Sequence, residues 1–519
     1  MKPPKRSVLY LPLIGLATML IGGCVTAPSL QNRPASHALS VDESRATTLG
    51  RAEARLAAAH PGKTGIHMLS NAHEAFAARA LLARAAQRTL DIQYYIWHKD
   101  LTGTLLFQSL NAAANRGVRV RLLLDDLNTS GLDPLLAALD ANPNIEVRLF
   151  NPFFIRAPRW INYLSDFSRL NRRMHNKSFT ADNQVTIVGG RNIGDEYFGA
   201  TDDMVFADLD VLAIGPVVKD VSESFDSYWS SLSSYPSNLL LPAANPALLR
   251  ELANDAATLE QDPRALPYLQ AVEGSSLIRR LRDGTIDLQW ADTKMVSDDP
   301  RKGLNQAPAS QLLPSKLERI VGRPRTDLEL VSSYFVPTAA GVNSFTAMAR
   351  RGVQIKILTN SLDATDVAAV HAGYAKWRKP LLEAGIKLYE MRRLSPASQK
   401  RERTGRFGIS GTSLHAKTFS VDGSRIFVGS FNFDPRSAKL NTELGFVIDS
   451  PVLAHAIAKA FDDKVPEVAY EVHLTDTGDL YWTEQKDGRE IRHDTEPNAS
   501  LWRRLVVNFL SLLPIDWML

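Results

Sequence analysis

A motif that occurs twice constrains this chain more than any other feature. Each copy reads His-x-Lys, four further residues, Asp, six further residues, and then Gly-[Gly/Ser]-x-Asn. The first copy begins at His175 and the second at His415. Two matches to six specified positions, at equivalent points of a longer repeat, are not a coincidence. The chain is therefore expected to fold as two related halves.

The residues before each motif repeat as well. In the first half, apolar and polar residues alternate over 90–96, a helical stretch covers 105–115, and a second strand pattern covers 118–124. The equivalents in the second half are 328–334, 342–350 and 353–358, and an Arg-Gly-Val tripeptide follows the helix in both halves. A strand–helix–strand unit implies parallel pairing of its strands. The predicted fold class is α/β, with mixed, largely parallel sheets.

The composition excludes several classes of protein. With 519 residues, of which 45% are hydrophobic and 22% charged, the chain is an ordinary globular protein of two to four domains. A net charge of +4 is too small to indicate nucleic-acid binding. Cys24 is the single cysteine of the sequence, so an internal disulfide and a cysteine metal cluster are both excluded.

The N-terminus is typical of an export signal. Lys2, Lys5 and Arg6 precede an apolar run over 8–20, and Gly22-Gly23-Cys24 follows. This order resembles a bacterial lipoprotein signal, in which Cys24 becomes the lipidated first residue; the alternative is an uncleaved anchor helix. Either way we expect a membrane-anchored protein of the bacterial cell envelope, with the choice of inner or outer membrane left open.

The two motifs resemble the paired HKD motifs of the phospholipase D superfamily. Further segments are similar to bacterial cardiolipin synthases, and in particular to the C type, which uses phosphatidylethanolamine as co-substrate. The resemblance runs from about residue 66 to the C-terminus and is carried by LDIQYYIW (90–97), GVRVRLLLDD (117–126), IEVRLFNPF (145–153), GGRNIGDEYFGA (189–200), IGPVV (214–218), HAGYAKWRK (371–379) and GSFNFDPRS (429–437).

This resemblance implies a fold and an activity. The fold is two phospholipase D-like α/β/α sandwich repeats, related by a pseudo-twofold axis, with the active site at their interface. The activity is transfer of a phosphatidyl group to make cardiolipin from phosphatidylglycerol and a second phospholipid, phosphatidylethanolamine, at a phospholipid membrane. The route runs through a phosphatidyl-histidine and requires neither a cofactor nor a metal.

The domain organisation follows from the repeat and the two ends of the chain. The predicted units are a signal peptide (1–24), a tether (25–65), the first repeat (66–235), a joining region (236–320), the second repeat (321–465) and a C-terminal extension (466–519). Within the joining region, residues 289–292 are a candidate part of the site. Within the extension, 501–513 is apolar with basic residues near its start, which favours either an interfacial helix or a helix docked on the core.

The motif residues suit phosphodiester chemistry. Such a transfer needs a nucleophile, a proton donor for the leaving alcohol, and positive charge around the phosphoryl oxygens. Residues two apart on a strand share a face, so each histidine points with its lysine. The predicted catalytic residues are His175, Lys177, Asn192, His415, Lys417 and Asn432. Family precedent favours His175 as nucleophile and His415 as acid/base, although the sequence itself is nearly symmetric.

Other residues have predicted supporting roles or two open interpretations. By position in the family, Asp208 and Glu443 are expected to orient the histidines, and the sequence leaves open which serves which. Asp182 and Asp422 begin turn pairs and are expected to be structural. Core packing and site roles remain open for Tyr94, Tyr95, Trp97 and Tyr334, a substrate contact remains open for His371, and Arg169, Arg172 and Arg173 could face lipid headgroups or solvent.

Three other functions compete with the synthase. A nuclease is disfavoured by the mild charge, the two motifs in one chain and the anchor. A non-catalytic scaffold is disfavoured because both motifs are intact. The serious alternative is a phospholipase D that hydrolyses phospholipids to phosphatidic acid, since its catalytic residues would be the same.

Overall fold

The computed structural model describes residues 27–201, 205–393, 413–486 and 488–519. The predicted signal sequence and Cys24 lie outside these ranges. No helix within them is long and apolar enough to cross a bilayer.

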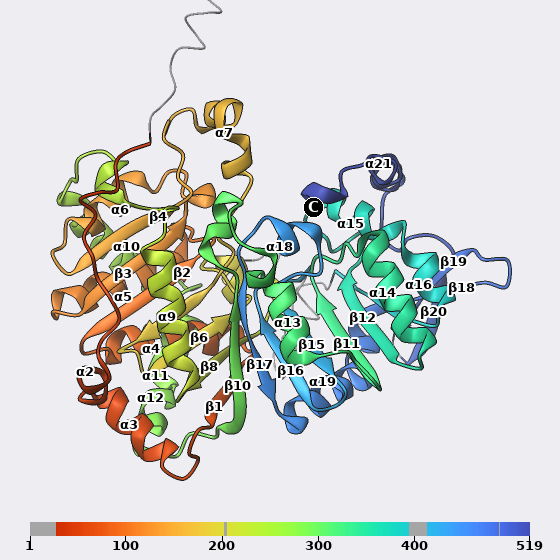
Figure 1. Cartoon of the computed structure of the whole chain (residues 1–519), viewed down its shortest axis with the longest axis horizontal. Helices are drawn as coiled ribbons and strands as arrows, with labels where there is room; N and C mark the ends of the chain where they lie inside the picture. The colour runs from red at the N-terminus through yellow and green to blue at the C-terminus, as the bar shows by residue number, and fades with distance from the viewer. Residues whose placement is uncertain (1–26, 202–204, 394–412, 487) are drawn as a thin grey trace, which may run out of the picture.

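A mixed β-sheet runs through the molecule, with helices on both faces (Figure 1). In the described ranges its order is β9-β4-β3-β2-β5-β6-β8-β1-β10-β17-β16-β15-β11-β12-β13-β18-β19-β20. The first-half strands are β1 (Thr64–Leu69), β2 (Thr89–Tyr94), β3 (Arg119–Asp125), β4 (Ile145–Phe150), β5 (Ser178–Ala181), β6 (Val185–Gly189), β8 (Asp210–Ile214) and β9 (Ser234–Pro236). The others are β10 (Gln289–Ser297), β11 (Asp327–Ser332), β12 (Gln354–Asn360), β13 (Lys387–Met391), β15 (Lys417–Val421), β16 (Arg425–Gly429), β17 (Leu444–Asp449), β18 (Ala469–Leu474), β19 (Leu480–Lys486) and β20 (Arg489–His493).

The two halves share one topology. The order β4-β3-β2-β5-β6-β8 of the first half matches β13-β12-β11-β15-β16-β17 of the second. The α/β class and the mixed sheets are therefore confirmed, but the expectation of largely parallel sheets is wrong. Parallel pairs occur where a helix crosses over between β2, β3 and β4 and between β11, β12 and β13. The motif strands return through tight turns instead, and a tight turn can only join antiparallel strands.

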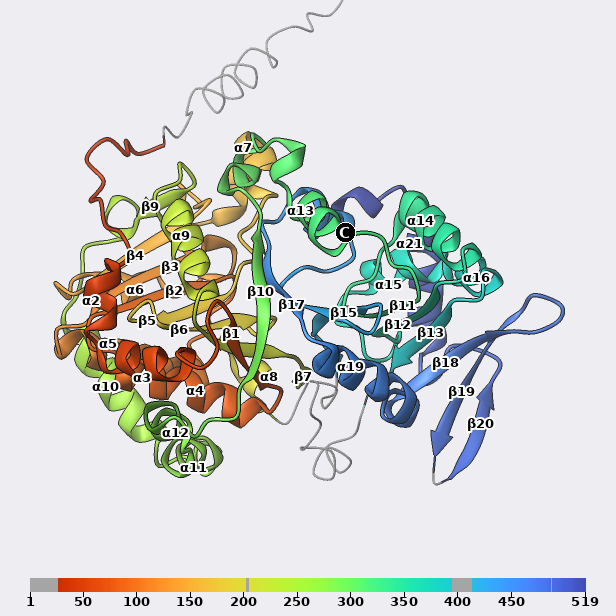
Figure 2. The same cartoon turned by 60° about the horizontal axis from the view of Figure 1, so that its bottom comes forward.

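Strand β10 joins the halves. It pairs antiparallel with β1 on one side and with β17 on the other, so the half-sheets are continuous (Figure 2). Residues 289–292, a candidate part of the site, form the start of this strand. Asp292 there pairs with Lys63 at 2.5 Å on the surface. Trp290 stacks on His60, and Ala291 is buried in a core of both halves, so the contacts of these three residues are structural.

Helices cover both faces because strand residues alternate between two cores. In β8, Leu212 and Ile214 face the core under α4 and α5, whereas Val211 and Ala213 face a core that contains residues of both halves. The first-half helices are α2 (Val41–Arg45), α3 (Thr48–Ala57), α4 (Ala72–Ala85), α5 (Leu101–Asn115), α6 (Asp133–Asp140), α7 (Asn162–Leu170), α8 (Asp195–Phe198) and α9 (Val217–Trp229). The remaining α-helices are α10 (Ala247–Leu259), α11 (Leu266–Gly274), α12 (Leu277–Asp283), α13 (Leu313–Val321), α14 (Thr338–Arg350), α15 (Ala368–Ala375), α16 (Arg378–Glu383), α18 (Pro435–Lys439), α19 (Pro451–Asp463), α20 (Val465–Val468) and α21 (Leu501–Ser511).

The stretch predicted as a tether packs on the first half from Arg33 onward. The Arg33 guanidinium donates to the carbonyls of Ser231 and Ser234 at 2.6 and 3.0 Å. Ser40 then caps α2 in a capping box with Glu43, which satisfies exposed backbone donors at the helix start. This part of the chain therefore belongs to the folded body.

Candidate active site

The two histidines stand where the halves meet. His175 precedes β5 and His415 precedes β15, at the sheet edge where the parallel strands β2 and β11 end. The His175 amide donates to the Thr442 carbonyl at 2.9 Å, and the His415 amide donates to the Ala207 carbonyl at 2.8 Å. Each motif is thus held by the backbone of the opposite half.

The orienting carboxylates are exchanged between the halves. His175 Nδ1 lies 2.9 Å from Glu443 Oε2, and His415 Nδ1 lies 2.5 Å from Asp208 Oδ2. All four side chains are buried or nearly so. A carboxylate on Nδ1 fixes the ring and leaves Nε2 free to react. The structure therefore answers the question that the sequence left open: each histidine is served by a residue of the other half.

Burial controls the charge of the two histidines. Burial, together with the charges of Lys177 and Lys417, lowers the pKa of His175 well below its usual value. Burial and Lys417 likewise lower the pKa of His415 to about 4. Both rings are consequently neutral near pH 7, which is the state that a nucleophilic Nε2 requires.

The two carboxylates differ in charge. Burial raises the pKa of Glu443 to about 7. Burial acts on Asp208 in the same direction, but it is outweighed by His415 and Lys417, so the pKa of Asp208 is lowered. An ionised Asp208 stabilises a protonated His415 better than a half-neutral Glu443 stabilises a protonated His175.

The motif lysines are buried cations. Lys177 Nζ donates to the His175 carbonyl at 2.5 Å, and Lys417 Nζ donates to the His415 carbonyl and to Ser333 Oγ. Burial lowers the pKa of Lys177 to about 7 and that of Lys417 to about 8. Two buried ammonium groups at one site favour the binding of an anion. The anion's negative charge would raise the pKa of both lysines back toward the ordinary value.

The motif asparagines are anchored through their carbonyl oxygens. Asn192 Oδ1 accepts from the Ile96 amide at 3.2 Å, and Asn432 Oδ1 accepts from Ser333 Oγ at 2.9 Å. The Nδ2 amide of Asn192 is buried without a hydrogen-bond partner in the described ranges. A buried donor of this kind is available to a phosphoryl oxygen.

The motif aspartates lie away from the histidines and fasten a hairpin. Asp182 is fully buried, and its carboxylate accepts from the amides of Gln87, Arg88 and Thr89 at 2.8–3.1 Å. Asp422 accepts in the same way from the amides of Arg325, Thr326 and Asp327. Each aspartate ties its β-turn to the start of the strand next to it, β2 or β11, which is a structural contact.

Aromatic rings surround both histidines. Tyr95 meets the His175 ring edge-on at 5.0 Å, and Tyr197 and Phe206 lie 5.2 and 5.0 Å from the His415 ring. Of the aromatics that the sequence left open, Tyr94 and Trp97 are core residues, the Tyr95 ring contacts His175, and Tyr334 reaches the site through its backbone amide, which donates to Asn432 Oδ1. Alternation along β2 separates Tyr94 from Tyr95, but Tyr197 and Phe206 gave no signal in the sequence.

Residues of the joining region support Glu443. Asp298 Oδ2 accepts from the Glu443 amide and from the buried Lys302 ammonium, both at 2.9 Å. Ser430 Oγ donates to the Glu443 carboxylate, and the Ser430 carbonyl lies 3.1 Å from His175 Nδ1. Ser430 occupies the second position of the Gly-[Gly/Ser] pair, which was its only signal. Asp298 and Lys302 were missed because their role depends on contacts between distant segments.

Two open interpretations resolve against substrate contact. His371 is buried on α15, with Nε2 2.8 Å from Arg378 and 3.4 Å from Glu496, so it belongs to a buried ion-pair network. Arg173 is fully buried against Asp125 at 3.2 Å, and Arg172 donates to the Lys439 carbonyl at 2.8 Å. Burial excludes the headgroup and solvent interpretations for Arg173, whereas Arg172 remains partly exposed while it fastens the segment that leads into the first motif.

One cluster could in principle hold a cation. Ligating atoms of His98, Asp100 and Glu196 lie within 4.8 Å of one another, outside the histidine pair. The Asp100 oxygens already accept from the amides of Gly103 and Asp195 at 2.9 and 2.7 Å. The contact with Gly103 makes Asp100 the N-cap of α5, and we assign no metal to the cluster.

The comparisons with known proteins agree with this geometry. Residues 80–229 and 318–465 each match the family model described as "Cardiolipin synthase, PLD-like domain", so the chain belongs to the phospholipase D superfamily, as the motifs predicted. Cardiolipin synthase C of Escherichia coli is 52% identical over 466 residues, covering 89% of this chain and 98% of that protein. An uncharacterized protein of Helicobacter pylori is 31% identical over 512 residues, covering 97% and 98%. The fold matches the crystal structure of phosphatidylserine synthase from Haemophilus influenzae with a TM-score of 0.56 at 14% identity, covering 91% of this chain and all of the other.

Proposed function

We propose that this protein is a cardiolipin synthase that transfers a phosphatidyl group through a phosphatidyl-histidine. The observation that carries the proposal is the exchanged pair of histidine–carboxylate contacts, flanked by two buried lysines. That arrangement supplies a neutral nucleophile, a second histidine for proton transfer and positive charge for one phosphodiester. The 52% identical synthase supports the assignment of the reaction.

In the first step, His175 Nε2 attacks the phosphorus of the donor lipid. The bond from phosphorus to the headgroup oxygen breaks as the N–P bond forms, and His415 gives its proton to that oxygen. An anionic phosphodiester between the lysines favours protonation of His415, and ionised Asp208 stabilises the resulting imidazolium. The lysines and the Asn192 amide stabilise the charge on the phosphoryl oxygens.

In the second step, the roles reverse. His415, now neutral, takes the proton from a glycerol hydroxyl of phosphatidylglycerol, and the alkoxide oxygen attacks phosphorus. The N–P bond breaks, cardiolipin leaves, and both histidines return to their starting states. Water in place of the glycerol hydroxyl would give phosphatidic acid, which is the hydrolytic alternative.

We also propose that phosphatidylethanolamine is the donor. Phosphatidylethanolamine carries no hydroxyl on its headgroup, so it can give a phosphatidyl group but cannot accept one to form cardiolipin. Exposed Asp366 supports this role. Its carboxylate accepts from the Tyr334 hydroxyl at 2.8 Å, and its negative charge partly offsets the lowering of the Lys417 pKa by burial. A carboxylate beside a phenol ring suits the ammonium of a departing ethanolamine.

The test is lipid analysis by mass spectrometry with purified protein in mixed vesicles. Phosphatidylethanolamine labelled in its acyl chains should give labelled cardiolipin and free ethanolamine when phosphatidylglycerol is present. Asp366→Asn should reduce that product selectively, whereas transfer between two phosphatidylglycerol molecules should persist. Asp476→Asn, at an exposed turn between β18 and β19, is the matched control. Phosphatidic acid as the main product would establish the hydrolase instead.

We propose a lipid at Cys24 as the envelope anchor. The basic start, the short apolar run and the single cysteine support it. Cys24→Ser should leave an unprocessed precursor that takes up no fatty-acid analogue. Identical migration of both proteins without label in either would contradict the anchor, and fractionation would identify the membrane.

A further inference from the structure

Large exposed apolar side chains gather in two patches, one on each half. The α7 patch comprises Trp160, Leu164 and Phe167, whose exposed fractions are 62%, 77% and 47%. The α21 patch lies on α21 and the residues after it, where Trp502 is 75% and Leu512 is 82% exposed. Figure 1 shows both helices at the same end of the molecule, on either side of α18. The α21 patch consists of Leu501, Trp502, Leu505, Phe509, Leu512 and Trp517.

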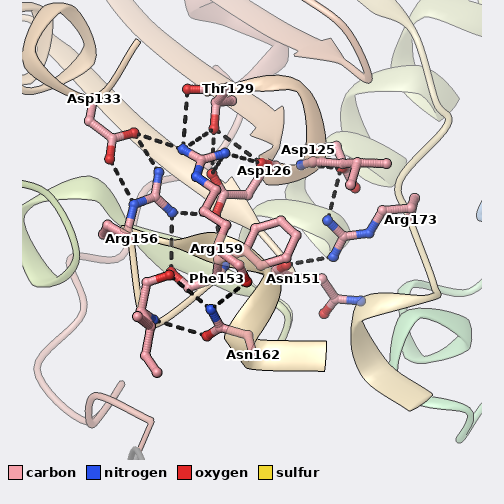
Figure 3. Close-up of polar contacts among 12 residues, drawn as sticks. Asp125, Asp126, Thr129, Asp133, Asn151, Phe153, Arg156, Arg159, Asn162 and Arg173 are labelled. Carbon is pink, nitrogen blue, oxygen red and sulfur yellow. Dashed lines mark hydrogen bonds and ion pairs between the residues drawn. The ribbon is translucent and has the colours of Figure 1, made fainter. Parts of the chain in front are cut away.

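A rigid polar base carries the α7 patch. Figure 3 shows Arg156 and Arg159, which come shortly before Trp160 in the chain, converging on Asp133, with ion pairs of 2.5 and 3.0 Å. Both arginines also pair with buried Asp126 at the end of β3. The chain is therefore fixed at the base of the patch, while its apolar tips point into solvent. Contiguous exposed apolar surface on a fixed support marks an interaction site.

Helix α21 has two apolar faces. Val507 is buried and packs with Leu362 and Ala372, which docks the helix on α15. Trp502, Leu505, Phe509 and Leu512 follow helical spacing on the opposite face and remain exposed. The interfacial and docked interpretations of 501–513 therefore describe two sides of one helix.

Both patches adjoin the rim of the active site. After α7, Asn171 Oδ1 accepts from Arg436 of α18 at 2.8 Å. Burial raises the pKa of Tyr95, whose ring contacts His175, and the positive charge of Arg436 opposes that rise. At the other rim, the Arg503 guanidinium of α21 donates to the Thr365 carbonyl at 2.7 Å, next to Asp366. Each patch is thus connected by a hydrogen bond to a segment close to the site, α18 after the second motif or the loop that carries Asp366.

We infer that the α7 and α21 patches together form a docking surface that enters the headgroup region of a phospholipid bilayer and holds the site against it. The inference rests on the proposed function, since a lipid substrate keeps its acyl chains in the bilayer. Three exposed tryptophans suit the membrane interface, where amphipathic rings are favoured. The described part of the chain starts three positions after the predicted lipid anchor, and Figure 1 shows its red start on the same side of the molecule as α7.

The first test places a reporter on each patch. Leu164→Cys and Leu505→Cys, labelled with an environment-sensitive fluorophore, are reconstituted in vesicles of phosphatidylglycerol and phosphatidylethanolamine. Lipids with nitroxide-bearing acyl chains should quench both labels. Val452→Cys is the control, because Val452 is 63% exposed on α19 at the opposite end, and it should not be quenched. The wild-type chain gives the background from Cys24. Absence of quenching at either patch, or equal quenching at all three positions, overturns the inference.

The second test separates docking from chemistry. Trp502→Ser combined with Leu505→Ser and Phe509→Ser should lower kcat/KM on vesicle lipids about tenfold or more, since each lost apolar side chain weakens insertion. Turnover of a monomeric short-chain phospholipid should not change, and Val452→Ser should affect neither. Equal loss on both substrates would mean that the outer face is structural, against the inference. If the wild-type protein turned over neither substrate, that result would instead contradict the proposed function.

Discussion

His175 and His415 share a similar environment but differ in the charge of the carboxylate behind them. Ionised Asp208 suits His415 to proton transfer, and this supports the proposed role of His175 as the nucleophile. His415→Ala should therefore accumulate phosphohistidine from a substrate with an activated leaving group, while His175→Ala should form none. Each variant should lose turnover of natural lipids by ~10²–10⁴-fold or more. Acid-labile label on His415 of the His175→Ala protein would reverse the two roles.

The buried lysines predict an alkaline loss of activity. The pKa values of Lys177 and Lys417 are lowered to about 7 and about 8, so both lysines are charged below these values and lose their protons as the pH rises through them. The free enzyme should therefore show a fall in kcat/KM between about pH 7 and pH 8. Lys177→Arg keeps its charge to higher pH. That variant should be slower but should show the fall at higher pH, as measured by pH profiles of kcat/KM; an unmoved profile would contradict the assignment.

At the residue scale, the sequence predicted which residues belong to the site better than it predicted which of them contact each other. The repeat located both histidines and both lysines, and position in the family supplied the two candidate carboxylates, Asp208 and Glu443. Which carboxylate meets which histidine depends on how two chain segments more than 200 residues apart approach each other. The site roles of Tyr197 and Ser333 depend in the same way on tertiary contacts, which a local sequence pattern does not reveal.

At the scale of elements, the motif hairpins are fastened by their aspartates. Asp182 is fully buried and accepts three backbone amides, while Asp422 is more exposed and makes the equivalent contacts with β11. Asp182→Ala leaves those amides unsatisfied and should lower the free energy of unfolding by about 2–4 kcal/mol. Asp422→Ala should cost less. Denaturant titration measures both values, and a larger loss for Asp422→Ala would contradict this ranking.

Helices and strands were predictable from the sequence where apolar residues followed a single helical or strand spacing over the whole segment. Strands β2 and β3 and helix α5 lie within a few residues of their predicted positions, because alternation and the Arg-Gly stop are local signals. Strand β10 was not identified, because its two neighbours come from different halves and its own residues do not reveal that it joins them. The docked face of α21 was left open for the same reason, since only Val507 distinguishes it.

At the scale of the whole molecule, three features join the halves: the continuous sheet through β10, the exchanged carboxylates and a core that both halves build. That core includes Val188 and Val211 of the first half and Val428 and Phe446 of the second. A half alone would expose this apolar surface and hold a histidine without its carboxylate. Catalysis and stability therefore share one interface, and neither half is expected to be an independent unit.

The halves should accordingly unfold together. Ala291 lies on β10 opposite Thr64 of β1 and is buried in the shared core, whereas Lys294 on the same strand is exposed. Ala291→Asp places an unpaired charge in that core and should lower the stability of the whole protein by roughly 3 kcal/mol or more. Lys294→Asp introduces the same side chain at the surface and should change little. Scanning calorimetry should show a single transition in the wild type that moves as one in Ala291→Asp. Two separate transitions, or early melting of one half, would show that β10 links the halves without making them cooperative.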